Sequence, residues 1–409
     1  MKKILILILI VSLALAGCRS VEAVGYEGEL EAQPITALDE SFARGVNDFG
    51  FGTAALLYGA DANFAVSPVS IELALAMTRS GAAGDTAQQM KDALGLSALS
   101  DDQIIAACRM LMWRANTGGM EAANSIWVDA DYPFNEDFIN TCTGDFMADA
   151  YPLTIPGAMD AINKWISERT HKRIEKMLQE EPDELTKLVL CNALYYLGEW
   201  ELPFDANDSW DDTFHAASGD VSTPFMHSGW SVPYYSNSDF SMISLNFKRA
   251  AGEGQYAMAL MLPAEGQSVS QLLNSLDGDS FAAALSAMKE QKVNISLPKF
   301  EYMYSASLVD TLSAMGMTDA FNPDMADFSG MTDGGEPLYI SAVLHKCYIR
   351  VDELGAEAAA ATVVSMETGA AVIDQPIVFD ADRPFVYAIY SVEDGTIAFL
   401  GAVNNPTQG

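Results

Sequence analysis

One stretch, residues 351–364, limits most strongly what this chain can fold into. It carries four consecutive alanines, which suit a helix, between the β-branched runs 349–351 and 362–364, which suit a strand. On an extended backbone, neighbouring side chains point to opposite sides. Over residues 356–367, one side carries both glutamates, Glu357 and Glu367, and the other carries only uncharged groups: Ala356, Ala358, Ala360, Thr362, Val364 and Met366. Such a segment can enter a β-sheet as an added strand whose charged side stays in water.

The sequence 353–362, Glu-Leu-Gly-Ala-Glu-Ala-Ala-Ala-Ala-Thr, resembles the reactive-loop hinge of inhibitory serpins, and 379–385 resembles the strand that follows that loop. Other stretches resemble serpin signatures in the same order along the chain: 63–70, 81–90, 123–128, 315–321, 327–331 and 399–406. The resemblance implies the α+β serpin fold, with three β-sheets, about eight or nine surrounding helices and an exposed reactive-centre loop.

The resemblance also assigns roles along the loop. The hinge comprises six residues: Glu353, Gly355, Ala356, Ala358, Ala360 and Thr362. Counting from the hinge by the family's usual spacing places the reactive bond at Gly369–Ala370, within one or two residues. The specificity positions before that bond are Met366, Glu367 and Thr368. No Lys or Arg occurs between Asp352 and Asp382, which favours proteases that accept small side chains over trypsin-like ones.

Two predicted strands each carry one polar residue on an otherwise apolar face. Asn192 has this place in the strand 186–196, and His345 has it in the strand 338–351. Buried polar groups need hydrogen-bond partners, so we expect the two side chains to meet. In serpins the matching residues form a cluster with the serines that correspond to Ser67 and Ser70, beneath the sheet where it opens.

Two further residues gain a role from the resemblance. Trp200 matches a tryptophan where the loop first enters the sheet, and Lys299 matches a lysine that pairs with the hinge glutamate, here Glu353. A partly exposed pair of this kind contributes roughly 0.2–1 kcal/mol.

The chain carries no recognisable catalytic motif. His345 and Cys347 lie two apart on one strand, and we expect their side chains to stand about 6–7 Å apart, too far for a catalytic dyad. The sequence contains no Gly-x-Ser-x-Gly or His-Glu-x-x-His motif and no phosphate-binding glycine loop. The four histidines also lack the close spacing of a zinc site. We therefore expect neither enzymatic activity nor a metal or cofactor.

The N-terminus has the pattern of an export signal. Lys2 and Lys3 precede an apolar run, 4–15, that is too short to span a bilayer, and Leu-Ala-Gly-Cys follows at 15–18. This tetrapeptide looks like a bacterial lipobox, which favours lipidation of Cys18 over an ordinary signal peptide with an incidental cysteine. We predict a signal peptide at 1–17, the lipidated cysteine and a flexible tether at 18–37, and one domain at 38–409.

Composition and local patterns complete the prediction. The net charge of −34 opposes binding to nucleic acid, and half of the residues are apolar, enough for a large core. We expect buried thiols rather than disulfides for the cysteines after Cys18. Asp39 and Ser67 are predicted helix caps, and the amphipathic pattern of 161–178 predicts one helix.

These features favour an extracellular, lipid-anchored monomer that inhibits serine proteases. The resemblance implies that an elastase-like or subtilisin-like protease cleaves the loop and is trapped as a covalent acyl complex when the hinge inserts into the sheet. Met366 is an alternative anchor for a chymotrypsin-like protease. Three other functions stay open: a non-inhibitory serpin that acts as a carrier or folding helper, an inhibitor of papain-like cysteine proteases, and a lipoprotein that binds solutes or host molecules.

Overall fold

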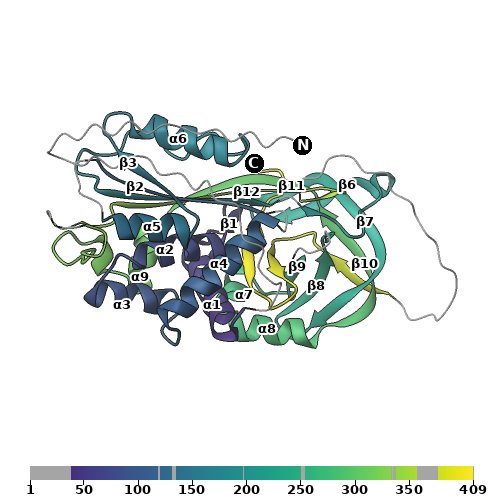
Figure 1. Cartoon of the computed structure of the whole chain (residues 1–409). Coiled ribbons are helices and arrows are strands. Elements are labelled where there is room, and N and C mark those ends of the chain that lie inside the picture. The colour runs from purple at the N-terminus through teal and green to yellow at the C-terminus, as the bar shows by residue number, and fades with distance from the viewer. Residues whose placement is uncertain are drawn as a thin grey trace, which may run out of the picture.

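The computed structural model describes residues 38–117, 120–130, 135–196, 198–249, 254–332, 334, 338–356 and 376–408. The described residues form nine α-helices, which Figure 1 places around the sheets. Their bounds are α1 Glu40–Leu57, α2 Pro68–Arg79, α3 Gly84–Ala93, α4 Asp101–Thr117, α5 Glu136–Gly144, α6 Ala158–Arg169, α7 Val269–Ser275, α8 Gly278–Ala287 and α9 Val309–Ala314.

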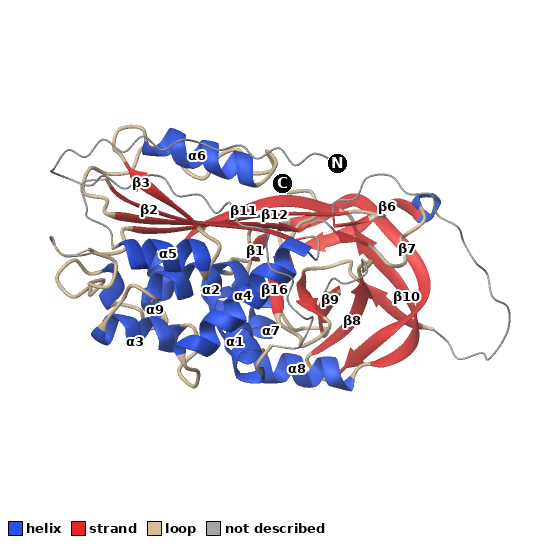
Figure 2. Ribbon diagram, in the orientation of Figure 1, coloured by secondary structure: helices blue, strands red, loops and turns tan. Residues whose placement is uncertain are grey.

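A five-stranded sheet crosses the molecule between two helical layers. Its strand order is β11–β12–β4–β2–β3, with bounds β11 Phe300–Ser307, β12 Ala342–Val351, β4 Leu188–Tyr196, β2 Met120–Asp129 and β3 Asp149–Leu153. Strands β12 and β4 are parallel neighbours in the middle of the sheet, and each is antiparallel to its other neighbour. Figure 2 shows α6 on one face of this sheet and α2, α4 and α5 on the other.

A larger sheet packs at the other end of the molecule. It contains β1 Phe64–Val66, β16 Ile397–Val403, β15 Phe385–Ser391, β9 Tyr256–Pro263, β8 Phe240–Asn246, β7 Gly219–Ser236, β10 Lys289–Pro298 and β14 Ile377–Asp380, in that order, and β6 Ser209–Ala216 pairs with β7. A third, two-stranded sheet joins β13 Gly355–Ala356 to β5 Gly198–Glu199. The three sheets and nine helices of the described residues confirm the predicted α+β architecture.

Alternation decides which side of each central strand is buried. Along β12, Val343, His345, Cys347, Ile349 and Val351 are all buried and face the main core. The residues between them face the opposite side, where a second apolar cluster lies between the sheet and α6. The main core therefore lies beneath the face that carries His345, and α6 covers part of the other face.

The predicted helix caps are present. The side chain of Asp39 accepts a hydrogen bond from the backbone N–H of Ser41 at the start of α1. Ser67 caps α2 in the same way through Ser70, and Pro68 occupies the first helical position, where a missing N–H costs little.

The prediction of one helix over 161–178 is wrong, because α6 ends at Arg169. The Thr170 hydroxyl bonds the carbonyl of Ile166 and the backbone N–H of Ile174, and His171 and Lys172 adopt positive φ values of 47° and 66°. The chain then crosses the sheet as a strap, residues 170–182. Ile174 and Met177 of the strap pack in the same apolar cluster as α6, so the apolar pattern continues after the helix has ended.

Candidate functional site

A hydrogen-bonded cluster lies beneath the central pair of strands. The backbone N–H of Ser67 donates to His345 Nε2 at 3.1 Å, so Nδ1 carries the proton and donates to Asn192 Oδ1 at 2.7 Å. Asn192 Nδ2 in turn donates to the carbonyl oxygen of Ser70 and to Oδ1 of Asn124, each at 2.5 Å. The predicted meeting of Asn192 and His345 is confirmed, and the bond between them joins β4 to β12.

The expected separation of His345 and Cys347 is wrong, because Cys347 Sγ lies 3.0 Å from His345 Nε2. The side chains lean toward each other on the strand, whereas the prediction assumed that both stand perpendicular to it. Burial lowers the pKa of His345 to about 3 and raises that of the Cys347 thiol well above its usual value. Both groups are neutral and fully buried, so the pair lacks the thiolate that a nucleophile requires.

The loop hinge is bound to the segment that follows β4. The backbone N–H of Trp200 donates to the carbonyl of Leu354 at 2.8 Å, and its indole Nε1 donates to the carbonyl of Asp352 at 3.0 Å. Strand β13 then pairs antiparallel with β5, so that Ala356 lies opposite Gly198. Ala356, the first residue on the uncharged side of the alternation, is 1% exposed. Trp200 therefore both fills the core and holds the hinge.

Gly355 meets two separate requirements for glycine at the hinge. Its φ is +147°, a conformation that residues with a side chain rarely adopt. A Cβ at this position would also collide with the backbone of Gly198 and Glu199. The close approach of β13 to β5 therefore depends on the missing side chain.

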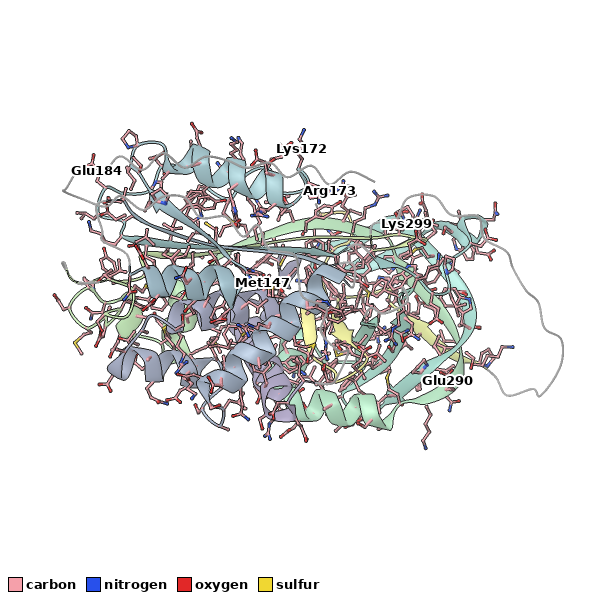
Figure 3. The ribbon with its side chains drawn as sticks, viewed as in Figure 1. Met147, Lys172, Arg173, Glu184, Glu290 and Lys299 are labelled. Atoms are coloured by element: carbon pink, nitrogen blue, oxygen red, sulfur yellow. The ribbon has the colours of Figure 1, made fainter. Side chains whose placement is uncertain are left out.

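The predicted pair of Lys299 and Glu353 is present, with Nζ and Oε1 2.5 Å apart. Burial is the largest single influence and acts to raise the pKa of the Glu353 carboxyl, but the hydrogen bonds that the carboxylate accepts, first among them that from Lys299, together with the charge of Lys299 leave the pKa below its usual value. The side chains are 34% and 13% exposed, so water screens part of the attraction. Lys299 lies between β10 and β11, near the top of the large sheet in Figure 3.

Several predicted residues lie outside the described residues. These are the lipidation site Cys18, the hinge residues Ala358, Ala360 and Thr362, the specificity positions Met366, Glu367 and Thr368, and the reactive bond Gly369–Ala370. Their roles remain predictions.

Sequence reasoning missed two parts of the site. Asn124 belongs to a matched signature, but its place in the cluster depends on the pairing of β2 with β4, which sets Asn124 opposite Asn192. Phe204, whose backbone N–H donates to the carbonyl of Glu353 at 2.9 Å, lies in a segment without regular alternation. Only the signature around Asn124 offered a signal in the sequence.

The described residues contain neither a cluster of metal-binding side chains nor a helix that could span a membrane. Across that part, no group of three or more His, Cys, Asp or Glu side chains is arranged to hold a metal ion. None of the helices in the same part is both long and apolar enough to cross a membrane. The four described cysteines are free and buried, as predicted.

The central parallel strand pair, the polar cluster beneath it and the bound hinge at its end define an α+β protein whose main sheet carries a parallel pair of strands at its centre. A family model described as "Serpin (serine protease inhibitor)" matches residues 44–406. The chain belongs to the serpin family.

Its relatives span nearly the same length. An uncharacterized serpin-like protein of Thermococcus kodakarensis is 36% identical over 89% of this chain and 85% of its own. Human antithrombin-III is 31% identical over 84% of this chain and 76% of its own. The crystal structure of tengpin, a thermophilic serpin, in the native state superposes with a TM-score of 0.83 at 31% identity, covering 94% of this chain and all of tengpin. Most serpins inhibit proteases and are not enzymes.

Proposed function

We propose that this protein is a suicide inhibitor of serine proteases. A target protease attacks the reactive bond between Gly369 and Ala370, the amine of Ala370 leaves, and the protease serine stays esterified to Gly369. The freed hinge then inserts as a new strand between β12 and β4. Insertion moves the protease, still esterified to Gly369, along with the loop before water hydrolyses the ester.

The observation that carries this proposal is the backbone pairing at the hinge. Asp352 already pairs antiparallel with Gly355, and Gly355 pairs antiparallel with Glu199. When the first pairing is continued along β12, Thr362 falls opposite His345, and when the second is continued along β4, Thr362 falls opposite Asn192. His345 and Asn192 are themselves directly opposite in the present sheet. The two pairings therefore give the inserting strand the same register, with Thr362 opposite both His345 and Asn192.

The same register explains the alternation of the loop. Directly opposite residues of antiparallel strands share a face of the sheet. Ala358 and Ala360 then fall opposite Ile349 and Cys347, which are buried and face the core. Glu357 falls opposite Arg350, whose side chain is 43% exposed on the other face. Small side chains thus enter the core, and a glutamate meets a cation.

Insertion also improves the pairing of the sheet. At present β12 and β4 are parallel neighbours, an arrangement slightly less stable per residue than an antiparallel one. A strand that runs back from the end of β12 would be antiparallel to both and would replace one ladder with two. The cost includes the bond between His345 and Asn192, which must break as the strands separate. The hydroxyl of Thr362 can then bond both groups.

The composition of the loop supports a target that accepts small side chains. Gly369 precedes the reactive bond, and basic residues are missing from 352–382. We assign elastase-like or subtilisin-like proteases as targets, with Met366 as the anchor for a chymotrypsin-like one. We also assign the protein to the outer face of a cell membrane through lipid on Cys18.

Incubation with a panel of serine proteases tests the proposal. We expect a complex with one of them that survives boiling in denaturant, together with a released C-terminal fragment that begins at Ala370. Mass spectrometry identifies the fragment. Cleavage outside 368–371 contradicts the assigned bond. If every protease cuts the loop without forming a complex, the carrier or folding-helper function is favoured instead.

A further inference from the structure

Two large apolar side chains stand exposed on the strands β6 and β14. Trp210 on β6 is 50% exposed and Val378 on β14 is 71% exposed. The indole of Trp210 stacks on the imidazole of His227 with ring centroids 3.6 Å apart and an angle of 12° between the planes. Tryptophan is enriched among the residues that dominate the binding energy of protein interfaces, so an exposed Trp210 is a candidate contact residue.

The strand registers place these residues on one face of the sheet. His227 lies opposite Ser296, which lies opposite Asp380, and Val378 is two residues before Asp380 on the same strand. Trp210 reaches the same face through its stacking on His227. We call this face, defined by Trp210, His227, Val378 and Asp380, the β6–β14 face; Figure 1 shows β6, β7 and β10 together at one end of the molecule.

Carboxylates surround the apolar part of the β6–β14 face. Burial, followed by the nearby charges of Asp382 and Asp212, raises the pKa of Asp380. Asp382 is paired with Arg383 at 3.1 Å, but within the described residues no ion pair joins Asp380 or Asp212 to a cation. The face therefore combines an aromatic ring with uncompensated negative charge.

The β6–β14 face lies between the two described ends of the loop. On one side, β14 begins at Ile377, only seven residues after Ala370, and that length of chain spans at most about 25 Å. On the other side, Lys299 holds Glu353 and also donates its backbone N–H to Pro224 of β7 at 2.9 Å. Pro224 is the neighbour of Phe225, which pairs with Trp210. A protease bound at the reactive bond is wide enough to reach this face.

We propose that the β6–β14 face is a second contact surface for the target protease and that it selects a protease with arginine or lysine side chains beside its active site. A guanidinium can stack on the free side of the Trp210 ring, and a second basic side chain of the protease can donate hydrogen bonds to the carboxylate of Asp380, which lies two strands from His227. An acidic protease meets repulsion from the same carboxylates, in a chain whose net charge is already −34. This inference rests on the proposed function.

The test compares W210A and D380N with the parent protein against a cationic and an anionic elastase. The association rate constant with the cationic elastase should fall about tenfold for each variant, and the difference should shrink in 0.5 M salt, where screening is strong. With the anionic elastase, W210A should react at the parent's rate, and D380N, which removes a repelling carboxylate, should react faster than the parent. The number of inhibitor molecules consumed per trapped protease should not change, because the hinge is intact. E290Q, at an exposed site on β10, is the matched control and should behave as the parent.

A binding measurement separates this inference from the proposed function. A cationic elastase whose catalytic serine is replaced by alanine cannot be trapped, yet it should bind the parent protein more tightly than W210A. Equal affinity for the two proteins overturns the contact surface and leaves the proposed inhibition untouched. An equal loss of rate with both elastases overturns the preference for cationic proteases. If the parent protein traps no protease but still binds the inactive elastase more tightly than W210A does, the proposed inhibition is refuted and the contact surface stands.

Discussion

The substitution A360E tests the inserting strand most sharply within the loop. The register places residue 360 opposite Cys347, which is 0% exposed and faces the main core. A glutamate there must be protonated to enter. With an ordinary pKa near 4.3, protonation at pH 7.3 costs about 4 kcal/mol, at about 1.36 kcal/mol for each pH unit.

A cost of this size decides the race between insertion and hydrolysis of the ester. Even about 2.7 kcal/mol on the insertion barrier slows insertion a hundredfold. A360E should therefore be cut at the same bond but release active protease, so the stoichiometry of inhibition rises steeply and the denaturant-resistant complex disappears. At pH 5 the protonation cost falls to about 1 kcal/mol, and part of the trapping should return.

The matched control is A359E. Residue 359 falls opposite Tyr348, on the face away from the core, where Tyr348 and Arg350 line an open groove. This variant should trap protease as the parent does. If A360E traps as well as the parent at pH 7.3, or if A359E is the more damaging variant, the proposed register is wrong.

The remaining predictions concern the hinge and the anchor. G355A should lower the melting temperature and weaken trapping, because its φ is +147° and a Cβ would strike the backbone of Gly198; an unchanged melting curve would contradict the close approach. E353Q should lose roughly 0.2–1 kcal/mol of stability at pH 7. Since its hydrogen bonds, first among them that from Lys299, together with the charge of Lys299 leave the pKa of Glu353 below its unfolded value, this contribution is present above that value and is lost as the pH falls through the folded pKa. Urea unfolding of both proteins at pH 7 and pH 3 measures it, and an equal difference in unfolding free energy at the two pH values would refute it. C18S should move the protein from the membrane to the soluble fraction and leave trapping intact; continued membrane association would contradict lipidation.

Periodicity and resemblance predicted the parts of the site that depend on strand alternation. Asn192 and His345 were expected to meet because each interrupts an apolar face, and the structure joins them at 2.7 Å. The pair Lys299–Glu353 came from the resemblance, since the two residues lie far apart in the sequence and neither interrupts a pattern.

The missed features depend on tertiary structure. The apolar period of 161–178 persists through the strap because Ile174 and Met177 pack beside α6, so periodicity alone could not mark the helix end at Arg169. The contact of His345 with Cys347 depends on how two side chains lean in a packed core. The pairing of β13 with β5 involves only two residues of each strand, which is too short for any alternation to appear.

The most direct test of insertion between β12 and β4 locks these two strands together. Leu344 on β12 lies directly opposite Cys191 on the neighbouring strand β4. At the spacing of paired strands, L344C can form a disulfide with the native thiol of Cys191. The matched control is S125C, because Ser125 lies opposite the same Cys191 on the other side of β4. Mass spectrometry verifies each disulfide before the assay.

The measurement is the yield of denaturant-resistant protease complex before and after reduction. Oxidised L344C should be cleaved without trapping protease, and reduction should restore trapping. Oxidised S125C should trap protease in both states, because its disulfide joins strands that stay together. Full trapping by oxidised L344C would show that the loop does not enter between β12 and β4.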